Sequence, residues 1–301
     1  MKAAVLTGYG DVDKLEVREL PDPKAGPNQI KVRMVGASIN PVDWKLRSGA
    51  FKAMMPLAFP AVLGRDASGE VVEVGLGVTA FKIGDRVMGR AQGCYAEFVV
   101  AETEAWAVVP TRMDLADAGA LPLVLLTGAQ LVEEAVNPRA GDKLLVTGAT
   151  GSVGRVAVFV AKSRGARVYA GVRRSQKSEA AKLGVDLVVA LDDDREIAGL
   201  PQLDCIADAV GGEMIKKLLG KVRPGGTIGS VVGEPAGAKD RGLVVRAMLA
   251  HSDGKRLAEL ARAVAEGKLI IPIAKRFPLD QAREAQKMAE AGAGGKVVLI
   301  G

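Results

Sequence analysis

A glycine-rich turn in the middle of the chain is the first feature whose residues and spacing could do chemistry. The stretch 146–154 reads VTGATGSVG and lies between an apolar run at 143–146 and an amphipathic run at 153–163. A strand, a glycine turn and a helix in that order leave N–H groups of the helix N-terminus free to bind a phosphate. The spacing G-x-x-G-x-x-G departs from the usual dinucleotide fingerprint, so a tight turn without a ligand is the alternative. The motif predicts a pyrophosphate bound by Gly148, Ala149, Thr150, Gly151, Ser152, Val153 and Gly154.

A basic turn follows the second predicted strand, at 167–172, and bears on the choice of cofactor. NAD-binding folds usually place Asp or Glu about 20 residues after the glycines, where it holds the ribose 2′-hydroxyl. That place falls here on Arg173, with Arg174, Ser175 and Lys177 close by and no carboxylate in the turn. Cations and a hydroxyl suit a 2′-phosphate, so the turn favours NADPH over NADH. An ordinary solvated basic turn is the alternative.

Two further segments end predicted strands and should lie near the same ligand. Asp208 and Ala209 follow a strand at 203–207, while Val231, Val232 and Gly233 close a strand at 227–232. Ligands bind at the carboxyl edge of an open parallel sheet. We therefore expect the backbones of these segments to flank the ribose and the nicotinamide. The side chain of Asp208 could instead cap the following helix.

The predicted elements that must position these residues fall into two regions that differ in secondary structure. Up to about residue 110 the chain reads as short strands with turns between them, which is typical of a small β-barrel-like domain. These strands are expected at 2–6, 15–19, 29–38, 67–74, 85–88, 95–100 and 105–109. From 114 onward an apolar helix at 121–135 leads into strands that alternate with helices, which predicts a parallel sheet covered on both faces. The stretch 244–249 is ambiguous between strand and helix, 256–265 and 279–291 read as helices, and a last strand at 296–300 should return to the first domain.

The composition is that of a globular protein, and a basic site for an anionic cofactor would explain part of its positive charge. The chain has 301 residues, 49% hydrophobic and 25% charged, with a net charge of +6 and 4% aromatic residues. Its basic residues are spread among acidic ones, which does not favour a nucleic-acid partner. The two cysteines, Cys94 and Cys205, do not suggest a disulfide framework and fit a reducing compartment. No signal peptide or apolar stretch approaching the roughly 20 residues of a membrane span is recognised, so we expect a cytoplasmic protein without a membrane partner.

Several motifs occur in an order that resembles one protein family. They read SINPVDWK at 38–45, GRDASG at 64–69, KIGDRV at 82–87, TGA at 127–129, the glycine turn, and GKVVL at 295–299. With them the chain resembles the zinc-free quinone oxidoreductase and enone reductase branch of the medium-chain dehydrogenase/reductase superfamily. The resemblance implies a GroES-like β-barrel domain, 1–113 plus 271–301, and a Rossmann doubly wound NADPH-binding domain, 114–270. It also implies a homodimer, and the strand near 227–232 could supply the paired edge.

The ligands for a catalytic or structural zinc are not found in this sequence. Zinc enzymes of the superfamily carry a Cys near the place of Ser38 and Gly-His-Glu where this chain reads Gly64-Arg65-Asp66. They also carry a four-cysteine lobe where this chain has only Cys94, and the sole histidine, His251, is expected at the surface. Without zinc no Lewis acid polarises a simple ketone. Conjugated acceptors need less help, because hydrogen-bond donors can stabilise the charge that develops on the carbonyl oxygen.

The resemblance assigns further residues to the site. It places Asn40 near the nicotinamide and Thr127 against the cofactor, although Asn40 could merely cap a turn and Thr127 could bond to the backbone. The side chains of Trp44, Lys45 and Phe51 are expected on the substrate side. Lys296, at the start of the last predicted strand, could reach the site or be solvated. Lys45 either assists the developing enolate or faces water. No general acid is recognised, and solvent could supply the second proton.

The sequence therefore predicts an NADPH-dependent, zinc-free oxidoreductase that acts on a small quinone or enone. Two alternatives stay open at this point. One is an enoyl reductase working on a carrier-bound acyl substrate. The other is an NADPH-binding sensor or RNA-contacting protein with little turnover.

Overall fold

The computed structural model describes all 301 residues and divides into two compact units. Unit 1 comprises Met1–Leu123 and His251–Gly301, and unit 2 is the continuous segment Val124–Ala250. The segments 114–123 and 251–270, which the sequence analysis assigned to the Rossmann domain, thus lie in unit 1. The reason is packing: helix α8 (Gly254–Ala265) contacts strand β8 (Trp106–Val108), and a Cβ on Gly254 would lie 2.2 Å from the carbonyl oxygen of Trp106.

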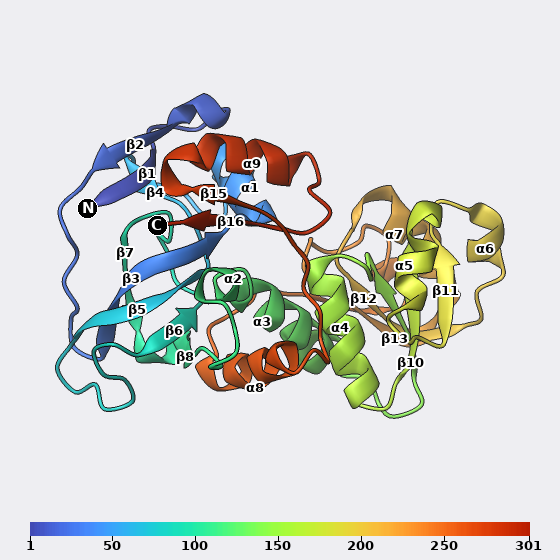
Figure 1. Cartoon of the computed structure of the whole chain (residues 1–301). Coiled ribbons are helices and arrows are strands. Elements are labelled where there is room, and N and C mark those ends of the chain that lie inside the picture. The colour runs from blue at the N-terminus through green and yellow to red at the C-terminus, as the bar shows by residue number, and fades with distance from the viewer. The chain divides into compact units, whose positions relative to one another are not determined.

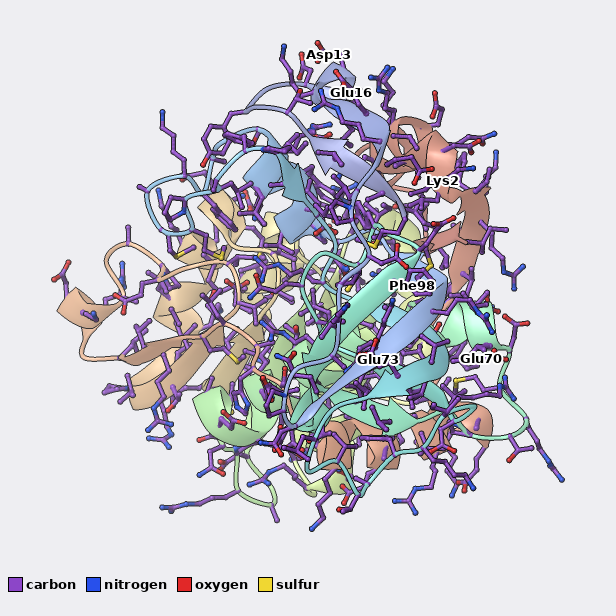
Figure 2. All side chains as sticks on the ribbon, turned by 90° about the vertical axis from the view of Figure 1, so that its left-hand side faces the viewer. Lys2, Asp13, Glu16, Glu70, Glu73 and Phe98 are labelled. Carbon is purple, nitrogen blue, oxygen red and sulfur yellow. The ribbon has the colours of Figure 1, made fainter.

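Unit 1 is built on two sheets. The smaller has three strands in the order β2-β1-β4, and the larger has seven, in the order β15-β16-β3-β5-β6-β8 with β7 paired to β3. Their bounds are β1 Lys2–Leu6, β2 Leu15–Glu19, β3 Gln29–Ser38, β4 Ala61–Val62, β5 Ala67–Val74, β6 Arg86–Gly89, β7 Phe98–Glu102, β15 Ile273–Pro278 and β16 Lys296–Ile300. In Figure 2, Phe98 and Glu73 mark β7 and β5, the strands that flank β3. The predicted return of the last strand to this domain is confirmed, because β16 pairs with β3.

Helices pack on the sheets of unit 1, and not all of them were predicted from the sequence. Helix α1 (Pro41–Arg47) was not predicted, yet it begins with Pro at its first turn and carries Asp43 at the third position. Helix α9 (Ala282–Glu290) packs on β15 and β16 in Figure 1. Strand β15 was not predicted, and it lies parallel to β16. A short helix, α2 (Leu115–Ala118), lies against β3 and β5.

Unit 2 contains a six-stranded parallel sheet in the order β11-β10-β9-β12-β13-β14. Counted within the unit this is the order 3-2-1-4-5-6 of a doubly wound dinucleotide-binding fold. The strands are β9 Lys143–Thr147, β10 Arg167–Val172, β11 Leu187–Ala190, β12 Leu203–Asp208, β13 Val222–Ser230 and β14 Val244–Ala247. The parallel sheet is confirmed, and the ambiguous stretch at 244–249 proves to be a strand that covers the outer edge of β13.

Four helices connect these strands; in Figure 1 their colours run from green for the first to orange for the last. They are α4 Ser152–Ser163, α5 Lys177–Ala181, α6 Asp194–Ala198 and α7 Gly212–Leu218. Helix α6 was not predicted. Its N-cap, Asp193, accepts a hydrogen bond from the N–H of Arg195 at 2.9 Å. The core of the sheet includes the fully buried Leu145, Leu203 and Ile206.

One helical stretch corrects the expectation about apolar length. Residues Leu115–Val136, which include helix α3 (Pro122–Gln130), form 22 residues that are apolar enough to cross a membrane by length and composition alone. However, 72% of its most apolar window is buried inside the protein, as in the core helix of a folded domain. The stretch is therefore weak evidence for a membrane span.

Candidate functional site

The glycine turn joins β9 to α4 with the geometry that a phosphate needs. Gly148 has a φ of +63°, and the N–H of Gly151 donates to the carbonyl oxygen of Gly148 at 2.9 Å. A Cβ on Gly154 would lie 2.1 Å from that same oxygen, so only glycine lets the helix approach the turn this closely. No side chain caps the N-terminus of the 12-residue helix, and its first N–H groups stay available to an anion.

Asp208 holds the carboxyl ends of three neighbouring strands together. Its Oδ1 accepts from the hydroxyl of Thr147 on β9 at 2.7 Å, and its Oδ2 accepts from the hydroxyl of Ser230 on β13 at 3.1 Å. Oδ1 also accepts from the N–H groups of Val210 and Gly211. The carboxylate is buried and fully used within the unit, so Asp208 is a positioning residue at the sheet edge.

A pocket of about 260 Å³ opens beside this edge. Asp208, Val232 and Gly233 belong to its lining, which also includes the start of α7. Val232 is exposed, and its N–H donates to the hydroxyl of Ser230 at 3.2 Å. The structure thus brings the two predicted strand ends, 208–209 and 231–233, to the same side of the sheet.

The basic turn is more nearly neutral than its sequence suggests. Arg174 is ion-paired with Asp193, and the ammonium of Lys177 lies 2.7 Å from Glu196. Asp193 is the N-cap of α6 and Glu196 lies within that helix, so two carboxylates from another element stand beside a turn that has none of its own. Hydrogen bonds from backbone N–H groups, Arg195 for Asp193 and Ala190 for Glu196, are the largest cause of the lowered pKa of each acid. The guanidinium of Arg173 is exposed and has no acidic partner, and Ser175 is exposed beside it.

In unit 1, Asn40 and Lys296 lie together in a buried polar cluster. The ammonium of Lys296 donates to Oδ1 of Asn40 at 2.6 Å and to the carbonyl oxygen of Ile39 at 3.1 Å. Asn40 is 1% exposed and Lys296 5%, so neither is solvated. Burial lowers the pKa of Lys296, while the charge of Asp66 raises it. An ammonium has three protons to donate, and one of them has no acceptor here.

The amide of Asn40 is held from its other side by an acid that the sequence analysis did not assign to the site. Its Nδ2 donates to Oδ2 of Asp66 at 2.9 Å, and the same oxygen accepts from the hydroxyl of Ser38 at 2.6 Å. The N–H of Leu123 donates to the other oxygen, and burial raises the pKa of Asp66. Asn40 is therefore fixed at both ends of its amide and does not simply cap a turn.

A second buried acid, Asp43, lies next to this cluster. Its Oδ2 accepts from the N–H of Asn40 and from the hydroxyl of Tyr95, both at 2.8 Å, and its Oδ1 has no partner. Burial raises the pKa of Asp43 to about 6. The spacing of Asn40 and Asp43 at the start of a helix could have indicated the contact between them, but the role of Tyr95 depends on tertiary packing.

The predicted substrate-side residues lie on α1 and just after it. The ammonium of Lys45 lies 5.3 Å from the centre of the Phe51 ring, so it stacks on that ring rather than pointing freely into water. Trp44 and Phe51 are half-buried and pack against the core of unit 1. In unit 2, Thr127 is half-buried in α3.

Comparisons with known proteins identify the family. The model of the alcohol dehydrogenase GroES-like domain matches residues 26–111, and that of the zinc-binding dehydrogenase matches residues 183–299. A 2-methylene-furan-3-one reductase from Solanum lycopersicum is 35% identical, with 99% of this chain and 79% of the relative covered. The chain belongs to the medium-chain dehydrogenase/reductase superfamily.

Two more similar proteins narrow the position within the superfamily. An NADPH-dependent alkenal/one oxidoreductase from Arabidopsis thaliana is 33% identical over 99% of this chain and 79% of its own length. The structure of a quinone oxidoreductase from Coxiella burnetii aligns with a TM-score of 0.89 at 30% identity, covering 100% of this chain and 99% of that one. This medium-chain dehydrogenase/reductase is accordingly an oxidoreductase of the quinone and enone reductase branch, with a GroES-like domain and a Rossmann domain.

One of the matching family descriptions includes zinc, but this member of the superfamily does not offer the donors. No group of three or more His, Cys, Asp or Glu side chains is arranged to hold a metal ion. Ser38 and Asp66 are bonded to each other, and Arg65 stands between Gly64 and Asp66 as a cation. The buried thiol of Cys94 has a pKa raised by burial, which disfavours the thiolate that zinc requires. The residues present do not fit zinc, and no step is assigned to it.

Proposed function

We propose that this protein is an NADPH-dependent, zinc-free reductase that transfers a hydride to a quinone or to the C=C bond of an α,β-unsaturated carbonyl compound. The observation that carries the proposal is the uncapped glycine turn at α4, followed at the end of β10 by a guanidinium, Arg173, without an acidic partner. The relatives, a 2-methylene-furan-3-one reductase and an NADPH-dependent alkenal/one oxidoreductase, support both the cofactor and the acceptor class.

The residues of unit 2 would hold the cofactor. The turn 148–154 supplies N–H groups to the pyrophosphate, and Gly148, with a φ of +63°, and Gly151 carry no side chain that would cover those groups. Arg173 and Ser175 would receive the 2′-phosphate, whereas Arg174 and Lys177 hold the turn through their ion pairs. The backbone around Ala209 and Val231 would flank the nicotinamide ribose. A bound NADPH supplies the hydride.

The residues of unit 1 would bind the acceptor and stabilise its charge. The Asn40 amide already uses both of its N–H donors, one to Asp66 at 2.9 Å and one to Ser38 at 3.2 Å. We therefore assign the donor role to the spare proton of Lys296. Asn40 then acts as a positioning residue that orients the ammonium. Trp44 and Phe51 supply an apolar wall, and the stacking of Lys45 on Phe51 keeps that ring in place.

NADPH consumption by metal-stripped protein tests the proposal. A 1,4-quinone and a small acyclic enone are offered side by side, with NADH as the control. Turnover that prefers NADPH is the expected result, and the better acceptor decides between quinone and enone. Cofactor binding without turnover of either acceptor would contradict the proposal and favour a carrier-bound acyl substrate or a sensor.

We further propose a cytoplasmic homodimer whose partners are small molecules rather than nucleic acid or membranes. Strand β13, which the sequence suggested as the dimer edge, lies between β12 and β14 and has no free edge. On that side of the sheet the free edge belongs to β14, whose Val244 is 41% exposed. Both cysteines are free thiols, in keeping with a reducing compartment. Light scattering after gel filtration measures the mass, and a monomer would contradict the dimer.

A further inference from the structure

Two arginines of unit 1 come together at one end of an antiparallel strand pair. Strands β5 and β6 pair with Ala67 opposite Gly89. Arg65 lies two residues before Ala67, and Arg90 directly follows Gly89, so both side chains start from the same end of the pair. They are close enough for the charge of Arg65 to lower the pKa of Arg90, although burial is the larger cause.

Neither guanidinium forms an ion pair with an acidic side chain. The closest polar contact of Arg65 is the sulfur of Met55, at 3.8 Å. Arg90 reaches the hydroxyl of Ser252 at 3.4 Å, and its Nε is buried without a partner. The other buried or half-buried arginines of unit 1 each meet an oxygen: Arg47 bonds to Glu290, Arg86 to the carbonyl oxygen of Met113, and Arg256 to Glu259.

The nearest acid does not neutralise the pair. Asp66 attracts Arg90 through its charge, but its two oxygens accept from Ser38, Asn40 and the N–H of Leu123 and form no ion pair with either arginine. Two half-buried cations side by side without an anion are costly, because each has lost part of its hydration and repels the other. A ligand with a negative charge would remove that cost.

We propose that Arg65 and Arg90 bind a carboxylate carried by the acceptor. The proposal rests on the proposed reductase function and deepens it: the substrate class becomes small conjugated carbonyl compounds that bear an acid group. The pair adjoins Asp66, and through it Asn40 and Lys296, where the acceptor is placed. Guanidinium groups match a carboxylate with paired N–H donors, and two of them suit its two oxygens.

The experiment compares 4-oxopent-2-enoate with its methyl ester, which keeps the conjugated C=C bond and removes the charge. The variants are R65Q, R90Q and R90K, the last in case loss of the buried charge at Arg90 prevents folding. R112Q is the matched control, because Arg112 is exposed and its loss changes the net charge equally. We expect kcat/KM for the acid to fall about 10- to 100-fold in R65Q and R90Q, as for a lost hydrogen bond to a charged group. For the ester it should change less than about threefold, and R112Q should leave both values unchanged.

Other outcomes would overturn the proposal. Equal losses on acid and ester would mean that the arginines serve the fold, and a matching rise in the Kd of NADPH would mean that they serve the cofactor. If the wild type reduces neither compound, the proposed function fails first. Calorimetric titration with the saturated analogue 4-oxopentanoate, in the presence of NADPH, then tests whether the two arginines bind a carboxylate, independently of turnover. Binding that R65Q abolishes would uphold the anion site, and no binding to the wild type would refute it.

Discussion

Replacing Asp43 by Asn should remove part of the pH dependence of the free energy of unfolding of unit 1. The carboxyl is fully buried, and both of its hydrogen bonds go to Oδ2, from the N–H of Asn40 and the hydroxyl of Tyr95. Oδ1 has no partner. An Asn side chain can place its carbonyl oxygen where Oδ2 stands and its N–H₂ where Oδ1 stands, so the variant keeps both hydrogen bonds and loses only the charge.

The magnitude follows from the pKa. Burial raises the pKa of Asp43 from 3.8 to about 6, against the opposing hydrogen bond from Tyr95. One pKa unit corresponds to about 1.4 kcal/mol, so the ionised carboxyl costs the folded state about 3 kcal/mol. Since the folded pKa lies above the unfolded one, the contribution of Asp43 to stability is fully present below the unfolded pKa and is lost as pH rises through about 6. Between pH 4 and 7.5 the wild type should lose about 2.5 kcal/mol relative to Asp43→Asn.

Urea unfolding followed by tryptophan fluorescence measures this difference. Both tryptophans, Trp44 and Trp106, lie in unit 1, so the transition reports on the unit that contains Asp43. With a urea slope of about 2 kcal/mol per molar, the midpoints of wild type and variant should diverge by about 1 M over this pH range. Asp280→Asn, at an exposed carboxylate, is the control for the change in net charge. A difference between wild type and variant that stays flat from pH 4 to 7.5 would refute the reasoning, because the carboxyl would then not be protonated by burial.

Four substitutions probe the cofactor and the acceptor side. Arg173→Asp should weaken NADPH binding about 10- to 100-fold and NADH binding little, because a carboxylate would face the 2′-phosphate; equal losses in fluorescence titrations would mean that the phosphate binds elsewhere. Gly154→Ala should raise the Kd of NADPH at least about tenfold, since its Cβ would meet a backbone oxygen at 2.1 Å, whereas in Gly151→Ala that distance is 3.2 Å and the loss should be smaller. Lys296→Met should lower kcat about 100-fold, because it removes the donor to the developing charge. The urea midpoint should fall modestly, since Oδ1 of Asn40 and the carbonyl oxygen of Ile39 lose their buried donor. An unchanged kcat would exclude Lys296 as the donor.

The elements that the sequence predicted well are those set by local patterning. Strand β10 was predicted with its observed bounds, Arg167–Val172, and β9 and α4 within one residue, because an apolar run, a glycine turn and an amphipathic run each carry their own signal. Helix α1 was missed, although Pro41 at its first position and Asp43 in its first turn are local signals of a helix start. Strand β14 is four residues long and mostly exposed, so its hydrophobic pattern could not separate strand from helix.

The functional residues were harder to predict where they depend on contacts distant in sequence. The glycine turn and Arg173 could be recognised from spacing. Asn40, however, precedes unit 2 in the sequence and Lys296 follows it, so no local pattern could predict the hydrogen bond between them. The ion pairs of Arg174 and Lys177 were missed for the same reason, because Asp193 and Glu196 come from the next connection along the sheet.

The order of the two units along the chain has a consequence for how the protein is made. Unit 2 is one uninterrupted segment that precedes β15 and β16, so all of it can leave the ribosome before either strand does. Strand β3 is made early, but its partner at Ala37 and Ser38 is β16, on the far side of unit 2. At about 5–20 residues per second, β3 waits on the order of ten seconds with part of one edge unpaired. Rapid folding of unit 2 would shorten the effective loop that this pairing must close, which lowers its entropic cost. Substitutions that slow the folding of unit 2 should therefore reduce the yield of unit 1 as well, even where they touch none of its residues.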